Sequence, residues 1–151
     1  METSRGRRVT NHPASTLTLT GGRPFGAVLV RDGRVIARAV NEVNQTKDPT
    51  AHAELLAIRN ASHSLGSASL SGCIVYASGH PCPMCLAAMH LCGIQAAFFA
   101  YSNDDGEAYG LSTASIYAQM AREPQAQSLA LRPLRPEDEH GLYDEWKRKQ
   151  G

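Results

Sequence analysis

The chain has 151 residues and a formal net charge of +1, with 42% hydrophobic and 19% charged residues. A chain of about 150 residues buries roughly 68–70% of the surface that it exposes when unfolded, so one domain with a proper core is expected. The near-neutral charge excludes a protein that binds nucleic acid or membranes through its overall charge. We therefore expect a single domain over residues 1–151, with residues 1–20 as an N-terminal arm.

Basic residues are absent from the centre of the chain, where no Lys or Arg occurs between Arg59 and Arg122. A partner bound there is not held by basic side chains on phosphates, which makes nucleic acid an unlikely partner. The sequence has no apolar run of the roughly 18–20 residues that a membrane span requires, and no secretory signal is recognisable. Four cysteines, two of them as Cys-x-x-Cys, are typical of metal or redox chemistry in a reducing compartment, so we expect a cytoplasmic protein.

The first predicted elements are two strands at residues 26–30 and 34–41, which are rich in apolar and β-branched residues. Asp32-Gly33 between them predicts a tight hairpin. Asp48-Pro49 then has the pattern of a helix cap followed by a first-turn proline. Apolar residues spaced for one helix face continue to residue 65, and Gly66 ends this predicted helix.

The second half of the chain predicts a strand at 73–77, a helix at 81–92 and a strand at 95–101. Because a strand, a short helix and a strand form a crossover unit, these two strands should be parallel neighbours. A helix at 112–121, a fifth strand at 128–131 and a terminal helix at 136–149 complete the pattern. The expected fold is α/β, a three-layer α/β/α sandwich with a central mixed five-stranded sheet.

Three residues at the expected helix starts have side chains that bind zinc, namely His52, Cys82 and Cys85. Structural zinc sites use four protein ligands, whereas catalytic sites use three and keep one position for water. Free N–H groups and the helix dipole favour a thiolate at a helix N-terminus. The set therefore predicts one catalytic zinc ion per chain.

Glu54 follows His52 by two residues, which is about 200° around a regular helix. It should therefore not be a fourth ligand on the same face. A carboxylate that reaches over the metal can act as a general base and then as a proton donor to a leaving group. The alternative is that Glu54 is a solvated helix carboxylate.

Several motifs resemble the cytidine deaminase-like superfamily of zinc deaminases, with the small guanine deaminases nearest and the tRNA adenosine deaminases a step away. They are Gly22-Arg23-Pro24-Phe25-Gly26-Ala27-Val28, Asn41, Asp48-Pro49-Thr50-Ala51-His52-Ala53-Glu54 and Pro81-Cys82-Pro83-Met84-Cys85. The resemblance implies the cytidine deaminase-like fold, zinc held by the two cysteines and the histidine, and proton transfer by Glu54. It also implies that Asn41, Phe25 and Ala53 contact the substrate. Core packing is the alternative for Phe25, and an ordinary strand-end position is the alternative for Asn41.

The chain departs from the family pattern at two places near the expected site. His80 stands where the family often has Glu before Pro-Cys, and we expect it beside the site without binding the metal. Guanine deaminases tend to carry acidic residues after a Gly-Phe beyond the fourth strand. This chain has Gly110-Leu111-Ser112-Thr113 there, with its acidic residues earlier, at Asp104, Asp105 and Glu107.

We therefore predict a zinc-dependent enzyme that hydrolytically deaminates a free nucleobase or a related heterocyclic amine, similar to guanine deaminase. A tRNA-specific adenosine deaminase is the first alternative, and a non-catalytic zinc-stabilised binding module is an alternative of another class. The family forms dimers or larger assemblies in which the last segment can complete a neighbour's pocket, so a homodimer is expected. Tyr143 and Trp146 are candidates for that contact, and packing against their own sheet is the alternative.

Overall fold

The computed structural model describes residues 22–151, so the predicted N-terminal arm at 1–20 lies outside the described residues. The chain separates into two compact units, one that ends at Tyr117 and one that comprises Ala118–Gly151. Among residues 22–151, no helix has both the length and the apolar character that crossing a membrane requires.

The first unit is built on a mixed sheet with strand order β2-β1-β3-β4. Strands β1 (Gly26–Arg31) and β2 (Arg34–Val40) form an antiparallel hairpin. Its turn uses Asp32 at φ 50° and Gly33 at φ 74°, the positive values that a two-residue hairpin turn of this kind requires. The predicted hairpin is confirmed.

Strand β3 (Cys73–Gly79) pairs with β1 in antiparallel and with β4 (Ala96–Tyr101) in parallel orientation. The parallel pair follows from the crossover through helix α4 (Pro83–Cys92), as predicted from the strand-helix-strand pattern.

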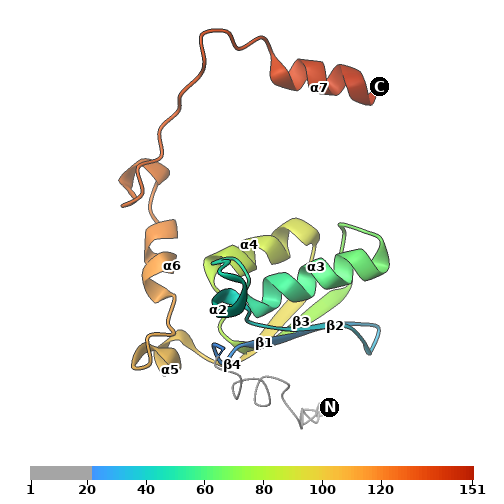
Figure 1. The fold of residues 1–151 in the computed structure, drawn as a ribbon, viewed down its shortest axis with the longest axis vertical. Helices are drawn as coiled ribbons and strands as arrows, with labels where there is room; N and C mark the ends of the chain where they lie inside the picture. Colours follow the sequence, from blue (N-terminus) through green and yellow to red (C-terminus); the bar gives the residue numbers. More distant parts are fainter. Residues whose placement is uncertain (1–21) are drawn as a thin grey trace, which may run out of the picture. The chain divides into compact units, whose positions relative to one another are not determined.

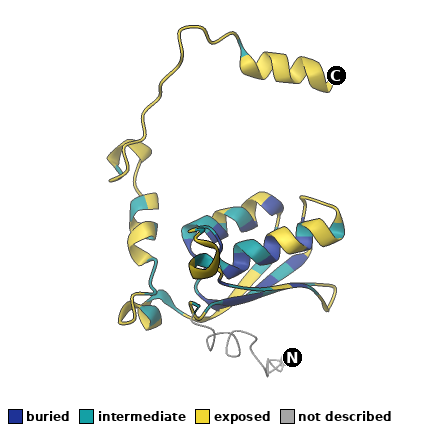
Figure 2. Cartoon of the chain, viewed as in Figure 1, coloured by how far each residue is buried: buried dark blue, intermediate teal, exposed yellow. Residues whose placement is uncertain are grey.

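Helices α3 (Ala53–Leu65) and α4 lie on the same face of the sheet (Figure 1). The side chains between these helices and the strands form the core, where dark blue residues gather in Figure 2. Leu29 and Val75 of the strands, Ala61 of α3 and Leu70 of the loop before β3 have no exposed surface. This packing fixes the N-terminal ends of both helices relative to the sheet, and the site lies at those ends.

The remaining elements are short. They are α2 (Val43–Thr46), α5 (Asn103–Glu107), α6 (Ala114–Met120), a 3₁₀ turn (Pro124–Ala126) and α7 (Leu142–Gln150). The α/β class and the mixed sheet are confirmed, but the described residues form four strands instead of the predicted five. Residues 128–131 are not a strand because none of them pairs with the sheet; the Ser128 N–H donates to the Gln119 side chain at 2.8 Å.

Candidate metal centre and adjoining pocket

The N-terminal ends of α3 and α4 bring the three predicted zinc ligands together. His52 is the N-cap of α3 and has an extended backbone, at φ −76° and ψ 148°. Cys82 is the N-cap of α4, and Pro83 fills the first helical position, where its missing N–H has no intrahelical bond to lose. Cys85 lies in the first turn of the same helix. The N-terminal ends of both helices, where N–H groups lack intrahelical partners, therefore lie at the ligand cluster.

The ligand atoms of His52, Cys82 and Cys85 all lie within 4.8 Å of one another. The His52 Nδ1 atom is 3.4 Å from the Cys82 Sγ atom. Bonds of about 2.0–2.3 Å in a tetrahedral zinc site place neighbouring ligand atoms roughly 3.3–3.8 Å apart. The donor set and this separation fit zinc, with three protein ligands as in catalytic sites.

Hydrogen bonds to sulfur explain the electrostatics of the cysteine pair. The Cys85 backbone N–H donates to the Cys82 Sγ atom over 3.5 Å. A hydrogen bond from the Cys85 thiol, reinforced by one from His52, lowers the pKa of Cys82 to about 4. The same interaction with Cys82, followed by burial, raises the pKa of Cys85. Without a metal the negative charge of the pair therefore lies on Cys82, whereas zinc binding requires both cysteines as thiolates.

Two neighbouring residues, Cys82 and Arg23, shift the pKa of His52 in opposite directions. The hydrogen bond with Cys82 raises the pKa of His52, while burial and the nearby Arg23 guanidinium oppose that shift. The imidazole is half-buried and lines the pocket.

Glu54 is only 7% exposed and lies at the edge of the ligand cluster. The Cys85 thiol faces its Oε2 atom at 3.8 Å. Burial raises the pKa of Glu54 above the usual value for a glutamate. The helical-wheel estimate of its direction does not apply, because His52 precedes the helix and only Glu54 lies within it.

A pocket of about 40 Å³ opens beside the cluster. Besides His52, Glu54 and Cys82 it is lined by Arg23, Phe25, Asn41, His80, Leu111 and Thr113. Asn41 is 3% exposed, and its Oδ1 atom accepts the Val43 N–H at 3.2 Å. This hydrogen bond fixes the orientation of the amide and leaves its NH₂ group as the free end. The structure thus places two of the predicted substrate residues, Asn41 and Phe25, at the pocket.

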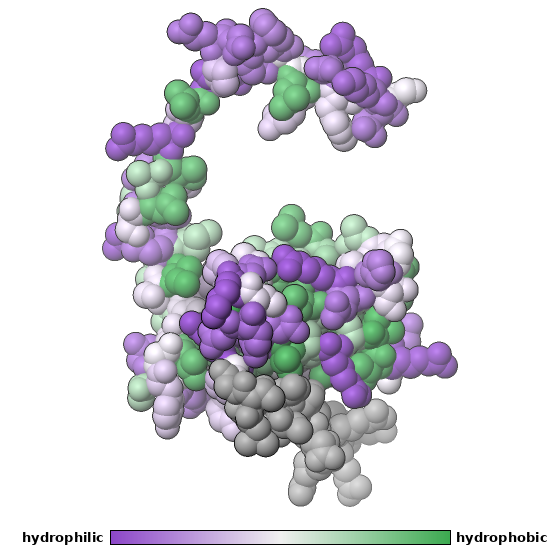
Figure 3. All heavy atoms as spheres, viewed as in Figure 1, coloured by the Kyte–Doolittle hydropathy of each residue, from purple (hydrophilic) through white to green (hydrophobic). Residues whose placement is uncertain are grey.

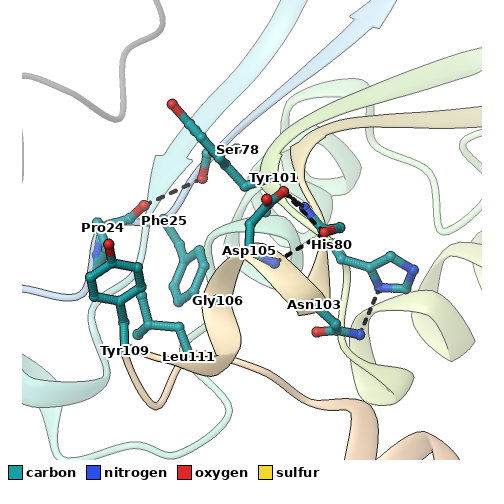
Figure 4. Close-up of a pocket in the computed structure, with 12 residues that line it drawn as sticks. Pro24, Phe25, Ser78, His80, Tyr101, Asn103, Asp105, Gly106, Tyr109 and Leu111 are labelled. Carbon is teal, nitrogen blue, oxygen red and sulfur yellow. Dashed lines mark hydrogen bonds between the residues drawn. The ribbon is translucent and has the colours of Figure 1, made fainter.

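Phe25 separates this pocket from a second cavity of about 200 Å³. Figure 4 shows its ring beside Leu111 in that cavity. The ring also lies against Gly79, because a Cβ atom built there would be 2.8 Å from the Phe25 Cε1 atom. Phe25 therefore both packs against the interior and lines the pocket. Core packing and a position at the substrate pocket, the two alternatives for this residue, each describe part of its environment.

Ala53, the third predicted substrate residue, is fully buried and clusters with Ala27 and Ala57 under Phe25. It is not among the pocket-lining residues, and its contact with substrate stays a prediction.

His80 lines the pocket and lies outside the group of metal ligands. Its Nδ1 atom is 3.0 Å from the Pro81 carbonyl oxygen, which also accepts a hydrogen bond from the Tyr117 hydroxyl. Asn103 faces the same Nδ1 atom, as Figure 4 shows, and its Oδ1 atom accepts the Thr113 N–H at 3.0 Å. These contacts join the loop before Cys82 to the segment that supplies Leu111 and Thr113.

Three pocket residues were not identified from the sequence: Arg23, Leu111 and Thr113. Arg23 lies inside the motif that contains Phe25, so its position in that motif was the available signal. The family resemblance placed residues 110–113 near the site, but it gave Leu111 and Thr113 no role in the pocket wall.

The fold and the site define a zinc-dependent hydrolytic deaminase. Residues 11–101 match the family described as the cytidine and deoxycytidylate deaminase zinc-binding region, and the chain belongs to this family. The chain is 42% identical to guanine deaminase of Bacillus subtilis over 108 residues, which cover 72% of this chain and 69% of that protein. An X-ray structure of guanine deaminase from Bacillus subtilis superposes with a TM-score of 0.82 at 35% identity, covering 89% and 87% of the two chains.

A tRNA-specific adenosine deaminase of Aquifex aeolicus is also similar, at 44% identity over 80 residues. The match covers 53% of this chain and 53% of that protein, so it spans about half of each.

Proposed function

We propose that this enzyme hydrolytically deaminates a free nucleobase or a related heterocyclic amine, with guanine as the first substrate to test. The observation that carries this proposal is the buried Glu54 carboxyl beside the ligands His52, Cys82 and Cys85, at a small pocket. The likeness to guanine deaminase of Bacillus subtilis supports the choice of guanine.

When bound by His52, Cys82 and Cys85, zinc supplies a Lewis acid that activates water at neutral pH. Glu54 holds the proton removed in this activation on its carboxylate and delivers it to the departing amine, so that ammonia leaves. Its raised pKa brings the group closer to neutral pH, which suits a carboxylate that must both accept and release a proton.

Asn41 and Phe25 position the ring in this proposal. The free amide NH₂ of Asn41 donates to an acceptor atom of the ring, and burial of Asn41 fixes its direction. Phe25 supplies an apolar wall on which the flat ring lies.

The test is ammonia release from guanine, adenine, cytosine and their nucleosides, and from aminotriazines, by zinc-loaded wild type and Glu54→Gln. We expect turnover of at least one free base and a loss of 10²-fold or more in kcat in the variant. Zinc content measured on both proteins separates loss of the proton carrier from loss of metal. Undiminished turnover in Glu54→Gln overturns the mechanism, and no turnover of any compound favours the non-catalytic binding module.

A tRNA-editing adenosine deaminase is the second candidate, favoured by the 44% identity to the Aquifex aeolicus protein. Phosphate contacts from Lys and Arg supply much of the affinity of nucleic-acid-binding proteins. The chain has none between Arg59 and Arg122, a stretch that includes Cys82, Cys85 and the pocket residues Leu111 and Thr113. Tight tRNA binding with a steep salt dependence, together with inosine formation, would overturn our choice of a free base.

We further propose that the enzyme is a homodimer. No residue of Ala118–Gly151 is buried, and the large apolar side chains that this unit exposes are Met120, Leu129, Leu131, Leu134, Leu142, Tyr143 and Trp146. Figure 3 shows apolar residues of this unit on the surface among hydrophilic ones. A segment with this composition gains stability by covering these side chains, and a second copy is the partner that we expect. A monomeric mass by light scattering at micromolar concentration would contradict this proposal.

We place the enzyme in the cytoplasm because its four cysteines are all free, and two of them are needed as metal ligands. A reducing compartment keeps such thiols from forming disulfides.

A further inference from the structure

The polar groups of the metal-centre pocket are mostly hydrogen-bond donors. Among the described residues that line it, Glu54 is the one carboxylate, and it faces Cys85 in the ligand cluster. The Asn41 Oδ1 atom accepts the Val43 N–H, so the NH₂ end of this amide is the end that can donate to a ligand. A ring that binds here must therefore present acceptor atoms to this wall.

Arg23 adds a full positive charge to the same pocket. Its backbone is held at the pocket wall, because the Phe25 N–H donates to the Arg23 carbonyl oxygen at 2.8 Å and Pro24 lies between them. Within residues 22–151 the guanidinium forms no ion pair, with Glu54 or with any other carboxylate. Arg23 is exposed, so its charge faces solvent and any ligand that enters the pocket beside it.

Glu54 and Cys82 are the lining residues that carry negative charge, and both belong to the metal centre, whereas the side chains on the other walls are neutral. The Thr113 hydroxyl donates to Asn103 and is neutral, and Leu111 and Phe25 are apolar. A guanidinium beside apolar walls matches the planar geometry of a carboxylate or phosphate, to which it can donate two parallel N–H bonds.

We propose that Arg23 binds an oxyanion of the substrate, so that the natural substrate is an acidic heterocyclic amine instead of an uncharged base. This inference rests on the proposed deaminase function and refines its substrate class. A ring carboxylate and the phosphate of a nucleotide are the two sources of such an oxyanion.

The test uses matched pairs of compounds that differ by one oxyanion: pterin and pterin-6-carboxylate, and guanosine and guanosine 5′-monophosphate. Ammonia release gives kcat/KM for wild type, Arg23→Gln and Arg34→Gln, all at equal zinc content. Arg34 is an exposed arginine at the hairpin end of β2, away from the pocket, so its variant is the charge-matched control. Binding of pterin-6-carboxylate, measured by its fluorescence, is read in parallel on the same three proteins.

We expect wild type and Arg34→Gln to prefer the acidic member of at least one pair tenfold or more in kcat/KM, through KM. Arg23→Gln should lose this preference and bind pterin-6-carboxylate at least tenfold more weakly. Preference within the pterin pair identifies a ring carboxylate, and preference within the guanosine pair identifies a phosphate.

The outcomes separate this inference from the proposed function. The role of Arg23 alone is overturned if the uncharged compounds are turned over without any preference for the acidic ones and if Arg23→Gln and Arg34→Gln bind pterin-6-carboxylate equally well. Weaker binding by Arg23→Gln without turnover of any compound supports the oxyanion site and overturns the deaminase proposal.

Discussion

Replacing Gly79 with alanine probes the contact that holds Phe25 at the pocket wall. The new Cβ atom would lie 2.8 Å from the Phe25 Cε1 atom and 3.1 Å from its Cδ1 atom. Carbon atoms in good contact are about 3.5–4.0 Å apart, so the ring must retreat by roughly 0.7 Å or more. Overpacking of this kind costs about 1–3 kcal/mol of folding stability.

We expect Gly79→Ala to lower the free energy of unfolding by about 1–3 kcal/mol in urea denaturation and to raise KM more than it lowers kcat. Gly22→Ala is the matched control, because its close neighbour at 3.0 Å is the end of the flexible Gln45 side chain, and the Asn41 carbonyl oxygen at 3.6 Å is an ordinary contact. In the double variant with Phe25→Leu, most of the loss should disappear, with a coupling energy of about 0.5–3 kcal/mol. Strict additivity of the two substitutions would refute the claim that the ring is the obstacle.

Three further predictions concern the metal ligands, the loop before Cys82 and the turn before α3. Cys85→Ser should lower the zinc content, measured by mass spectrometry, from one ion per chain to near zero. Cys92→Ser alters a buried thiol outside the ligand set and should retain zinc, so equal zinc content in the two variants would contradict the assignment. Tyr117→Phe removes the hydrogen bond to the Pro81 carbonyl oxygen and should lower the free energy of unfolding by about 0.5–1.5 kcal/mol. Tyr109→Phe changes an exposed tyrosine and should leave the free energy of unfolding unchanged, so equal losses in the two variants would argue against that hydrogen bond. Hydrogen bonds from the Thr50 hydroxyl and N–H lower the pKa of Asp48 below 3.8, so its contribution to stability is present above that pH and is lost as pH falls through the lowered pKa. Asp48→Asn should therefore show a smaller stability difference than wild type between pH 7 and pH 3, and an unchanged difference would refute this linkage.

The hairpin and the crossover were predictable because their signals are local. Asp32-Gly33 supplies the positive φ angles of the turn. Gly66 ends α3 in the left-handed conformation, as the sequence indicated, and Gly93 ends α4 in the same way. Local chemistry of this kind depends little on distant parts of the chain.

The start of α3 was predicted too early, because Asp48-Pro49 resembles a helix cap. In the structure Asp48 accepts the Thr50 N–H at 2.8 Å in a tight turn, and the helix begins at Ala53. The side chain thus satisfies a turn instead of a helix end. This shift places His52 in extended backbone, where it faces Cys82.

The ligand set was predictable from residue types and spacing, whereas the rest of the pocket was not. Arg23 lies in one of the motifs, but nothing in that motif indicates that its side chain lines the pocket. Thr113 depends on the hydrogen bond to Asn103, a contact ten residues away along the chain. The predicted strand at 128–131 failed because strand propensity needs a neighbouring strand to be realised.

The most direct test of the account is isotope transfer from water during turnover of the best free base in the panel. Zinc-loaded wild type in H₂¹⁸O should release ammonia and a product that carries one ¹⁸O atom. Glu54→Gln with the same zinc content should form that product at least 10²-fold more slowly. Product without the label, or labelled product at the wild-type rate from the variant, would contradict hydrolytic deamination through Glu54.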